Sequence, residues 1–226
     1  TKVYCPGHYD VNQHRIYCWK RAGHGDVDLA KSIIESCDVY YYDLARELGI
    51  EAIADMARRF GLGEEYDFEL PEEKPGLIPD KAWKRRVVGD KWRPGDTINA
   101  SIGQGHVLAT PLQMAVMTAR LVNGGVAVKP WMVAGMGGRS VIPDPNRFER
   151  IRVNPGHLAL VRQAMDDVVN TEDGTAKASA IDLDGQKMGG KTGTAQVRRI
   201  TREERLSGAL DQMDIIWKRR DHALFV

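Results

Sequence analysis

The sequence predicts an α+β domain in which helices outnumber strands. Apolar residues recur at helical spacing in several segments, whereas strand-like segments are short and few. The expected elements do not alternate regularly between strand and helix, which favours layered α+β packing over a doubly wound sheet. At 226 residues, 42% of them hydrophobic, the chain is long enough to bury a core.

Periodicity and turn residues predict the elements in chain order. Asp26 or Asp28 can cap the first helix, and Gly49 and Gly61 can end the second and third. The expected elements are an irregular segment at 1–26, helices through Glu35, over 38–48 and over 50–60, a loop at 63–80, a basic helix near 80–87, a helix from Pro111 to Gly124, short strands and turns over 126–153, a helix from Pro155, a strand over 187–197 and the start of a buried strand at 223–226.

Thr110, Pro111 and Gln113 give the clearest local signal of structure. Thr110 can cap a helix, Pro111 suits its first position, and Gln113 completes a capping box. The apolar face of this helix is expected to comprise Ala115, Val116, Ala119 and Val122. Asn154 and Pro155 open another helix, whose inward residues are expected to be Leu158, Val161, Met165, Val168 and Val169.

The charge and hydropathy of this sequence show no sign of nucleic-acid binding or of a segment that spans a membrane. The net charge is +1 and the basic clusters are short, so no nucleic acid is expected to bind. No apolar run approaches the ~20 residues that span a bilayer, and no signal peptide opens the chain. Because the chain starts and ends abruptly, we interpret it as a piece of a longer protein.

Two short polar motifs are candidates for chemistry. Residues 191–194 read Lys-Thr-Gly-Thr, and this combination suits a carboxylate-bearing acyl substrate held along a strand edge. Ser36 and Asp38, with Cys37 between them, place two hydrogen-bonding side chains on one side of a tight turn. Each motif alone also fits a structural role, because Lys-Thr-Gly occurs by chance in loops, and Ser and Asp often cap helices.

Further blocks connect these motifs to a known family. Together with Ile102-Gly103-Gln104-Gly105, Thr110-Pro111-Leu112-Gln113 and Gly174-Thr175-Ala176, they resemble the transpeptidase domain of class B penicillin-binding proteins. The sequence around Gly23-His24-Gly25 and Ser36 is most similar to the penicillin-binding protein 2 branch, which acts in cell elongation. The resemblance implies a serine β-lactamase-like fold over 1–226, with an antiparallel sheet flanked by helices.

The resemblance also implies an activity and roles for particular residues. The family crosslinks peptidoglycan stem peptides through a serine acyl-enzyme, as a D,D-transpeptidase that penicillin inhibits. Ser36, beside Asp38, would pass protons to the leaving amine, and Lys191 would strengthen the field around the nucleophile. The N–H of Thr194 would form half of the oxyanion hole. The hydroxyls of Thr192 and Thr194 would hold the terminal carboxylate, and Gly193 would keep the strand edge open.

The sequence departs from the family pattern in two ways. The second family motif usually ends in Asn and here ends in Asp38. No serine is followed by Lys three positions later, so the nucleophile motif Ser-x-x-Lys is expected upstream of Thr1, and this chain alone should not form an acyl-enzyme. Two alternatives stay open. One is a serine β-lactamase or β-lactam sensor domain, and the other is a non-catalytic, zinc-stabilised interaction module of the same fold.

The three cysteines and one histidine form a candidate metal set. Cys5, Cys18, His24 and Cys37 supply three thiolates and an imidazole, which make a complete tetrahedral zinc site. Some penicillin-binding protein 2 members similarly carry zinc at corresponding Asp, His and Cys positions, and a metal would order residues 1–37. A Cys5–Cys18 disulfide with free Cys37 and three unligated thiols remain alternatives. The reserve ligands are His8, Asp10 and His14.

The resemblance extends to partners and location. It implies stem peptides ending in D-Ala-D-Ala as substrate and β-lactam antibiotics as inhibitors. It also implies a membrane glycosyltransferase of the elongation machinery as partner. The parent protein would be held in the bacterial inner membrane by a single-pass anchor outside this sequence, with this domain in the periplasm.

Overall fold

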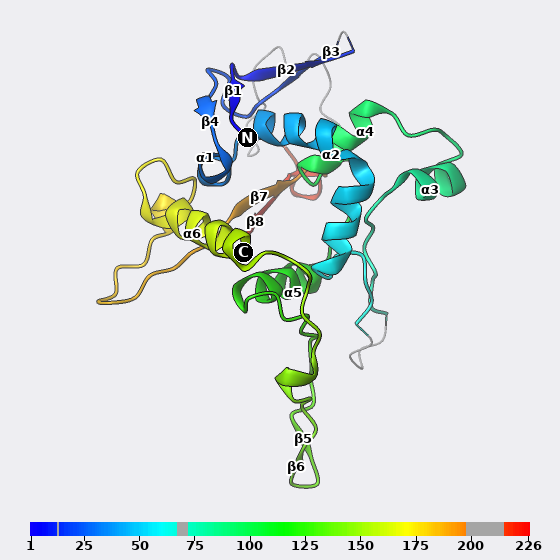
Figure 1. The fold of residues 1–226 in the computed structure, drawn as a ribbon, viewed down its shortest axis with the longest axis vertical. Helices are drawn as coiled ribbons and strands as arrows, with labels where there is room; N and C mark the ends of the chain where they lie inside the picture. The colour runs from blue at the N-terminus through cyan, green and yellow to red at the C-terminus, as the bar shows by residue number, and fades with distance from the viewer. Residues whose placement is uncertain (13, 67–71, 198–214) are drawn as a thin grey trace.

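The computed structural model describes residues 1–12, 14–66, 72–197 and 215–226 of the chain (Figure 1). Its helices are α1 (Leu29–Ile34), α2 (Asp38–Arg59), α3 (Lys81–Trp83), α4 (Pro94–Ser101), α5 (Pro111–Val122) and α6 (Pro155–Asn170), with a π-helical turn at Lys84–Val88 and 3-10 turns at Pro145–Arg147, Lys177–Ser179 and Trp217–Arg219. Its strands are β1 (Val3–Cys5), β2 (His8–Val11), β3 (His14–Tyr17), β4 (Gly25–Val27), β5 (Gly135–Met136), β6 (Arg139–Ser140), β7 (Thr192–Ala195) and β8 (His222–Phe225).

The strands are short and pair antiparallel. Among the described residues they form four two-stranded sheets, which are β1–β4, β2–β3, β5–β6 and β7–β8. The expected mixture of helices and antiparallel strands is therefore confirmed. In Figure 1, the hairpin of β5 and β6 projects away from the rest of the chain. No helix in the described part of the chain is both long and apolar enough to cross a membrane.

The prediction of an irregular segment at 1–26 is wrong. This segment contains four strands, and β1 pairs with β4 across the intervening hairpin of β2 and β3. Each strand has only three or four residues, which is too short for a period-two pattern to stand out. Residues from β1 and β4 instead join a core cluster with Cys18, Cys37 and the start of α2.

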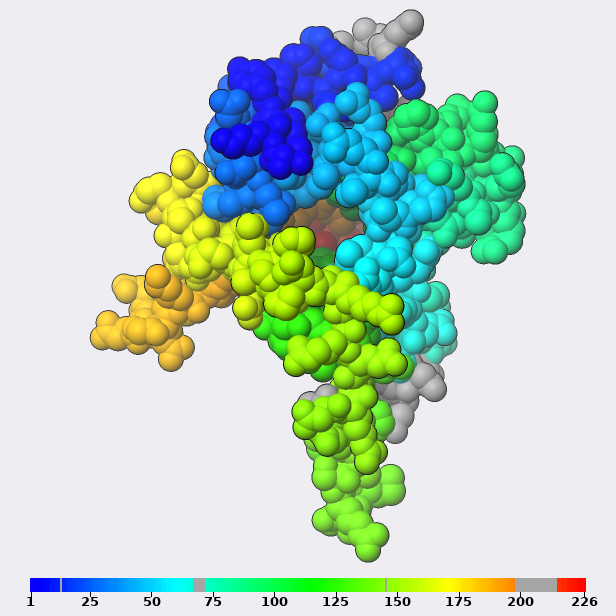
Figure 2. All heavy atoms as spheres, in the orientation of Figure 1, coloured from blue at the N-terminus to red at the C-terminus, as the bar shows by residue number. Residues whose placement is uncertain are grey.

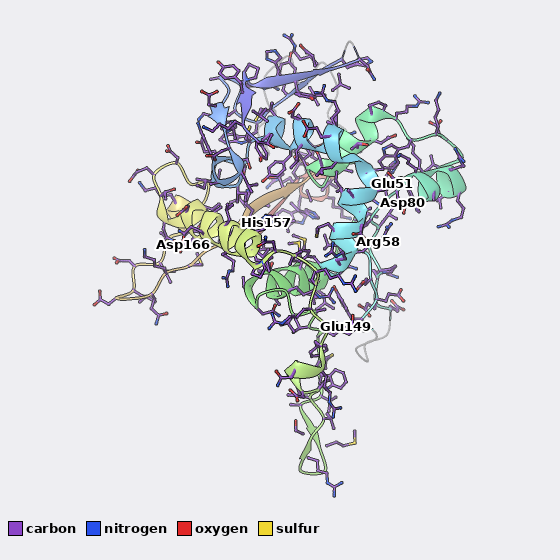
Figure 3. All side chains as sticks on the ribbon, viewed as in Figure 1. Glu51, Arg58, Asp80, Glu149, His157 and Asp166 are labelled. Atoms are coloured by element: carbon purple, nitrogen blue, oxygen red, sulfur yellow. The ribbon has the colours of Figure 1, made fainter. Side chains whose placement is uncertain are left out.

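The predicted break between the first two helices is confirmed. Asp28 caps α1, accepting a hydrogen bond from the N–H of Lys31 at 3.0 Å. The next helical segment begins at Asp38, and Gly49 interrupts α2 with non-helical backbone angles. The second half of α2 is fixed by an ion pair between Arg58 and Asp80 at 2.7 Å, near which Glu51 also lies in Figure 3.

Helix α5 begins as predicted but buries different residues. Thr110 and Gln113 form the expected capping box. The inward residues are Gln113, Val116 and Arg120, whereas Ala115 and Val122 are exposed, so the apolar face predicted from spacing is largely wrong. Hydrogen bonds explain the difference, because Gln113 Nε2 donates to the carbonyls of Glu64 and Pro75 at 2.8 and 2.7 Å.

Two other elements differ from the sequence-based expectations. Helix α4 was not predicted, although Pro94 occupies its first turn and Asp96 accepts from the N–H of Arg93 at 2.7 Å. The expected strand at the end of the chain is present as β8, but it is exposed rather than buried, with Leu224 at 43% and Phe225 at 44% exposure.

Helix α6 is the support on which the later segments rest. Its inward residues Val168 and Val169 are fully buried and pack with Ile33 of α1 and with Ala176. Figure 2 shows a hollow between α1, α2 and α6, with atoms of β7 and β8 visible at its base. Ile33 of α1, which leads to Ser36, and Met188, which precedes β7, both pack against buried residues of α6.

We expect the substitution Gln113→Ala to lower the free energy of unfolding by about 2–3 kcal/mol, because it removes a buried side chain and leaves the Glu64 and Pro75 carbonyls without their donor. Urea unfolding followed by tryptophan fluorescence measures this change. Gln163→Ala on the exposed face of α6 is the matched control and should change stability by less than about 0.5 kcal/mol. Equal effects of the two substitutions would contradict the assigned role of Gln113.

Candidate active site and metal centre

Ser36 lies in a strained turn between α1 and α2. Its φ angle is +53°, in the left-handed region that non-glycine residues rarely adopt. The N–H of Cys37 donates to the Ser32 carbonyl at 3.0 Å, which closes the turn, and α2 begins at the next residue. Backbone strain of this kind persists only where surrounding contacts hold it.

Lys191 is brought to the same place by backbone contacts with α6. The N–H of Gly190 donates to the Met165 carbonyl at 2.9 Å. On the Ser36 side, the N–H of Thr175 donates to the carbonyl of Ile34, the last residue of α1, at 3.3 Å. These bonds connect the segment before β7 to α6, and the segment after α6 to the end of α1.

The central contact of the site joins the two polar motifs. Lys191 Nζ donates a hydrogen bond to Ser36 Oγ, across 155 positions of sequence. The same ammonium donates to the Thr192 carbonyl at 2.9 Å and to Thr192 Oγ1 at 3.3 Å. Burial lowers the pKa of Lys191, while the Asp38 carboxylate opposes that shift. A desolvated ammonium beside a hydroxyl is suited to moving protons.

The backbone of β7 exposes hydrogen-bonding groups on the edge away from β8. Lys191 and Val226 exchange two hydrogen bonds, at 2.7 and 3.2 Å, so the next directly bonded pair in this register is Gly193 with Leu224. In an antiparallel ladder the alternate residues, Thr192 and Thr194, then direct their N–H and C=O groups to the opposite edge. Such an edge can bind an extended peptide.

Asp38 occupies the first turn of α2, behind Ser36. Burial raises the pKa of its carboxyl group to about 7, and the neighbouring Cys18 sulfur adds to the shift. The N–H of Trp19 donates to Asp38 Oδ2 at 3.0 Å. Asp38 is thus linked both to the Ser36 turn and to the cysteine-rich segment.

The four predicted metal ligands meet at one buried point. The three sulfurs and a ring nitrogen of His24 all lie within 4.8 Å of one another, and these residues are at most 5% exposed. His24 Nδ1 lies 3.5 Å from the sulfurs of both Cys5 and Cys18. A zinc ion with Zn–S bonds of about 2.3 Å and a Zn–N bond of about 2.0 Å would hold sulfur and nitrogen about 3.5 Å apart. The set could therefore hold a metal ion.

The surroundings of the sulfurs favour a thiolate at Cys18, whereas hydrogen bonding to Cys18 and burial raise the pKa of Cys37. The Cys37 thiol and the N–H groups of Lys20, Asp38 and Val39 lower the pKa of Cys18 by donating to its sulfur. His24 Nε2 is buried without a hydrogen-bond partner among the described residues, so the ring is held from its Nδ1 side.

Close backbone packing holds the ligands of this loop together. Gly23 has φ +83°, and an added Cβ there would lie 2.3 Å from the Cys5 carbonyl oxygen. The His24 N–H donates to that same carbonyl at 3.1 Å.

The structure also shows which of the alternative cysteine states and ligands it contains. All three cysteines are free thiols, so no Cys5–Cys18 disulfide is formed. Of the reserve ligands, Asp10 is instead paired with Arg15 at 2.8 Å in the hairpin of β2 and β3, and neither His8 nor His14 joins the cluster in the described part of the chain.

Three residues contact the site without having been assigned a role. Thr175 Oγ1 lies 2.9 Å from Thr192 Oγ1, and Gln104 Nε2 donates to the Thr194 carbonyl at 2.8 Å. Both belong to blocks that carry the family resemblance, which was the available signal. Trp19 contacts the Ser36 turn, and no sequence pattern indicated it.

Comparison with known proteins identifies the family of this chain. The penicillin binding protein transpeptidase domain matches residues 2–209. The chain belongs to this family. Among curated relatives of this penicillin-binding protein transpeptidase domain, the peptidoglycan D,D-transpeptidase MrdA of Acinetobacter baumannii is 37% identical over 100% of the chain. The chain spans 33% of that relative's length.

Solved structures show the same fold. Pseudomonas aeruginosa PBP2, in a crystal structure with WCK 5153, superimposes with a TM-score of 0.80 at 35% identity, over 100% of this chain and 47% of that one. Helicobacter pylori PBP2, in its complex with MreC, gives a TM-score of 0.79 at 34% identity, over 100% of this chain and 38% of that one. The transpeptidase fold expected from the sequence is therefore confirmed.

Gly193 and Gly174, which both belong to the family blocks, differ in the space available for a side chain. A Cβ at Gly193 would meet only Leu224 Cβ, at an ordinary 3.8 Å, whereas a Cβ at Gly174 would lie 2.2 Å from the Val168 carbonyl oxygen. We expect Gly193→Ala to change the free energy of unfolding by less than about 0.5 kcal/mol. Gly174→Ala should lower it by about 1–3 kcal/mol.

Urea unfolding of the two variants tests this distinction. A large loss of stability in Gly193→Ala would contradict the prediction, because it would show that this glycine is needed for folding.

Proposed function

We propose that the protein containing this chain is a peptidoglycan D,D-transpeptidase that penicillin inactivates. The observation that carries the proposal is the contact of the Lys191 ammonium with the Ser36 hydroxyl, beside the free edge of β7. Membership of the transpeptidase family supports it, as does the similarity to relatives named for this activity.

In this proposal the chain supplies the proton-transfer and binding groups around an external nucleophile. A serine of a Ser-x-x-Lys motif, which these 226 residues do not contain, attacks the carbonyl of the penultimate D-Ala. Ser36, held by Lys191, passes a proton to the leaving amine. The Lys191 charge stabilises the negative charge that develops in the transition state. Asp38 acts as a support behind the Ser36 turn.

The strand edge binds the substrate. The N–H of Thr194 points to the free edge and serves as one donor of the oxyanion hole. The hydroxyls of Thr192 and Thr194 receive the terminal carboxylate, and Thr175 orients the hydroxyl of Thr192. Gly193 leaves room for the peptide. A second stem peptide then takes the acyl group, which forms the crosslink.

We further propose that Cys5, Cys18, His24 and Cys37 hold a structural zinc ion. Four protein ligands leave no open position for chemistry, so the ion contributes folding energy and fixes residues 1–37. The meeting of four donors at one buried point supports this role.

For the parent protein we propose the location and partners that the resemblance implies. A single-pass anchor outside this sequence would hold it in the bacterial inner membrane, with this domain in the periplasm. It would act beside a membrane glycosyltransferase of the elongation machinery.

Fluorescent penicillin tests the activity in the full-length protein. We expect a covalent penicillin adduct that hydrolyses far more slowly than the acyl-enzyme of a β-lactamase. We expect Lys191→Ala to slow acylation by ~10²-fold or more. Lys187→Ala, at an exposed position just before the strand, is the matched control and should acylate normally.

The outcomes separate the alternatives. Rapid release of the adduct would indicate a β-lactamase. Absence of any adduct in the unmodified protein would indicate a non-catalytic module and contradict the proposal.

Metal analysis of protein purified without a chelator or a histidine tag tests the zinc proposal. We expect close to one zinc per chain, loss of the metal in Cys37→Ser, and no loss in His14→Ala. Because structural zinc stabilises the folded state, Cys37→Ser should also unfold at a lower temperature. A zinc content far below one per chain, with three titratable thiols, would rule out the site.

A further inference from the structure

Trp19 makes an unusual set of contacts at the active-site turn. Its indole Nε1–H donates to two carbonyl oxygens, of Glu35 at 3.0 Å and of Ser36 at 2.9 Å. Its backbone N–H donates to Asp38 Oδ2 at 3.0 Å. Trp19 is 58% exposed, so burial does not account for its position.

The two accepting carbonyls belong to successive peptide groups. The Glu35 carbonyl is part of the peptide group before the Ser36 α-carbon, and the Ser36 carbonyl is part of the one after it. One indole N–H therefore fixes both peptide planes that define the backbone angles of Ser36. These angles include the unfavourable φ of +53°, which requires outside support.

The direction of the Ser36 side chain follows from those angles. With the backbone in this conformation, Oγ reaches the Lys191 ammonium. Rotation of either peptide plane would move the hydroxyl away from Lys191. A displacement of about 1 Å at a reacting group can slow catalysis ~10²-fold.

Trp19 also links the turn to the cysteine-histidine cluster. It directly follows Cys18, and its ring meets the ring of His24 edge-on, with centroids 5.6 Å apart. Asp38, which accepts from its backbone N–H, directly follows Cys37. The position of Trp19 is thus set from the cluster on one side and acts on the Ser36 turn on the other.

We propose that Trp19 is a positioning residue for the transpeptidase reaction, which holds Ser36 in its active conformation through the indole N–H. The inference rests on the proposed function, because Ser36 must take part in acylation for its position to matter. It predicts a defect in the chemical step and not in binding, since in the described part of the chain the hydrogen bonds and ring contact of Trp19 go to the Ser36 turn, Asp38 and His24 and not to the β7 edge.

Acylation kinetics of the full-length protein with fluorescent penicillin test the proposal. We expect Trp19→Phe to lower the acylation rate constant ~10- to 100-fold, with little change in the dissociation constant of the non-covalent complex. Zinc content and the thermal unfolding midpoint should match those of the unmodified protein. Trp131→Phe, at a half-exposed tryptophan in the segment that leads to β5, is the matched control and should leave acylation unchanged.

A double substitution shows whether Trp19 acts through Ser36. If it does, Trp19→Phe combined with Ser36→Ala should be no slower than Ser36→Ala alone. Additive losses would overturn the proposal, and so would normal acylation by Trp19→Phe. A loss that accompanies release of zinc would assign Trp19 to the cluster alone and would also overturn it.

A closer analogue of tryptophan decides the case in which Trp19→Phe is unstable. The non-natural residue 3-benzothienylalanine keeps the bicyclic ring and replaces the indole N–H with sulfur. Slow acylation by this variant supports the proposal, and normal acylation overturns it. Failure of the unmodified protein to react with penicillin is a different result, because it refutes the proposed function as a whole.

Discussion

The hydrogen bond between Lys191 and Ser36 is the contact on which the arrangement of this site depends. It joins residues 155 positions apart, so the chain must hold both ends in place. Helix α6 and the segment after it provide that support. Met165 receives the backbone of Gly190, and Thr175 bonds to the last residue of α1. The buried apolar residues of α6 thus set the geometry of a polar site that they do not touch.

The cysteine-rich segment contributes to the same site from the opposite side. Its strands are too short to be stable as isolated hairpins, and its core consists largely of the cysteines themselves. A metal ion held by Cys5, Cys18, His24 and Cys37 would supply the missing folding energy. Because Cys37 lies between Ser36 and Asp38, fixing the position of Cys37 in the cluster also restrains the backbone of the Ser36 turn.

Local sequence signals predicted the helices well where capping residues were present. Thr110 with Gln113, Asn154 with Pro155, and Asp28 each mark a helix start that the structure contains. Helix α4 was missed although Pro94 and Asp96 offered a similar signal. The buried face of α5 could not be predicted, because Gln113 and Arg120 are buried through bonds to loops that are distant in sequence.

The sequence by itself determined the chemistry available to this protein: the ammonium, hydroxyl and thiol groups, and the order of the blocks that mark its family. Only the tertiary structure decided which of these groups meet. Ser36 reaches Lys191, and Trp19 reaches the Ser36 turn between α1 and α2, through side-chain hydrogen bonds over long sequence separations. Residue identity fixes what a group can donate or accept, whereas distance and direction arise from the packing of α1 on α6, and no short sequence pattern encodes that packing.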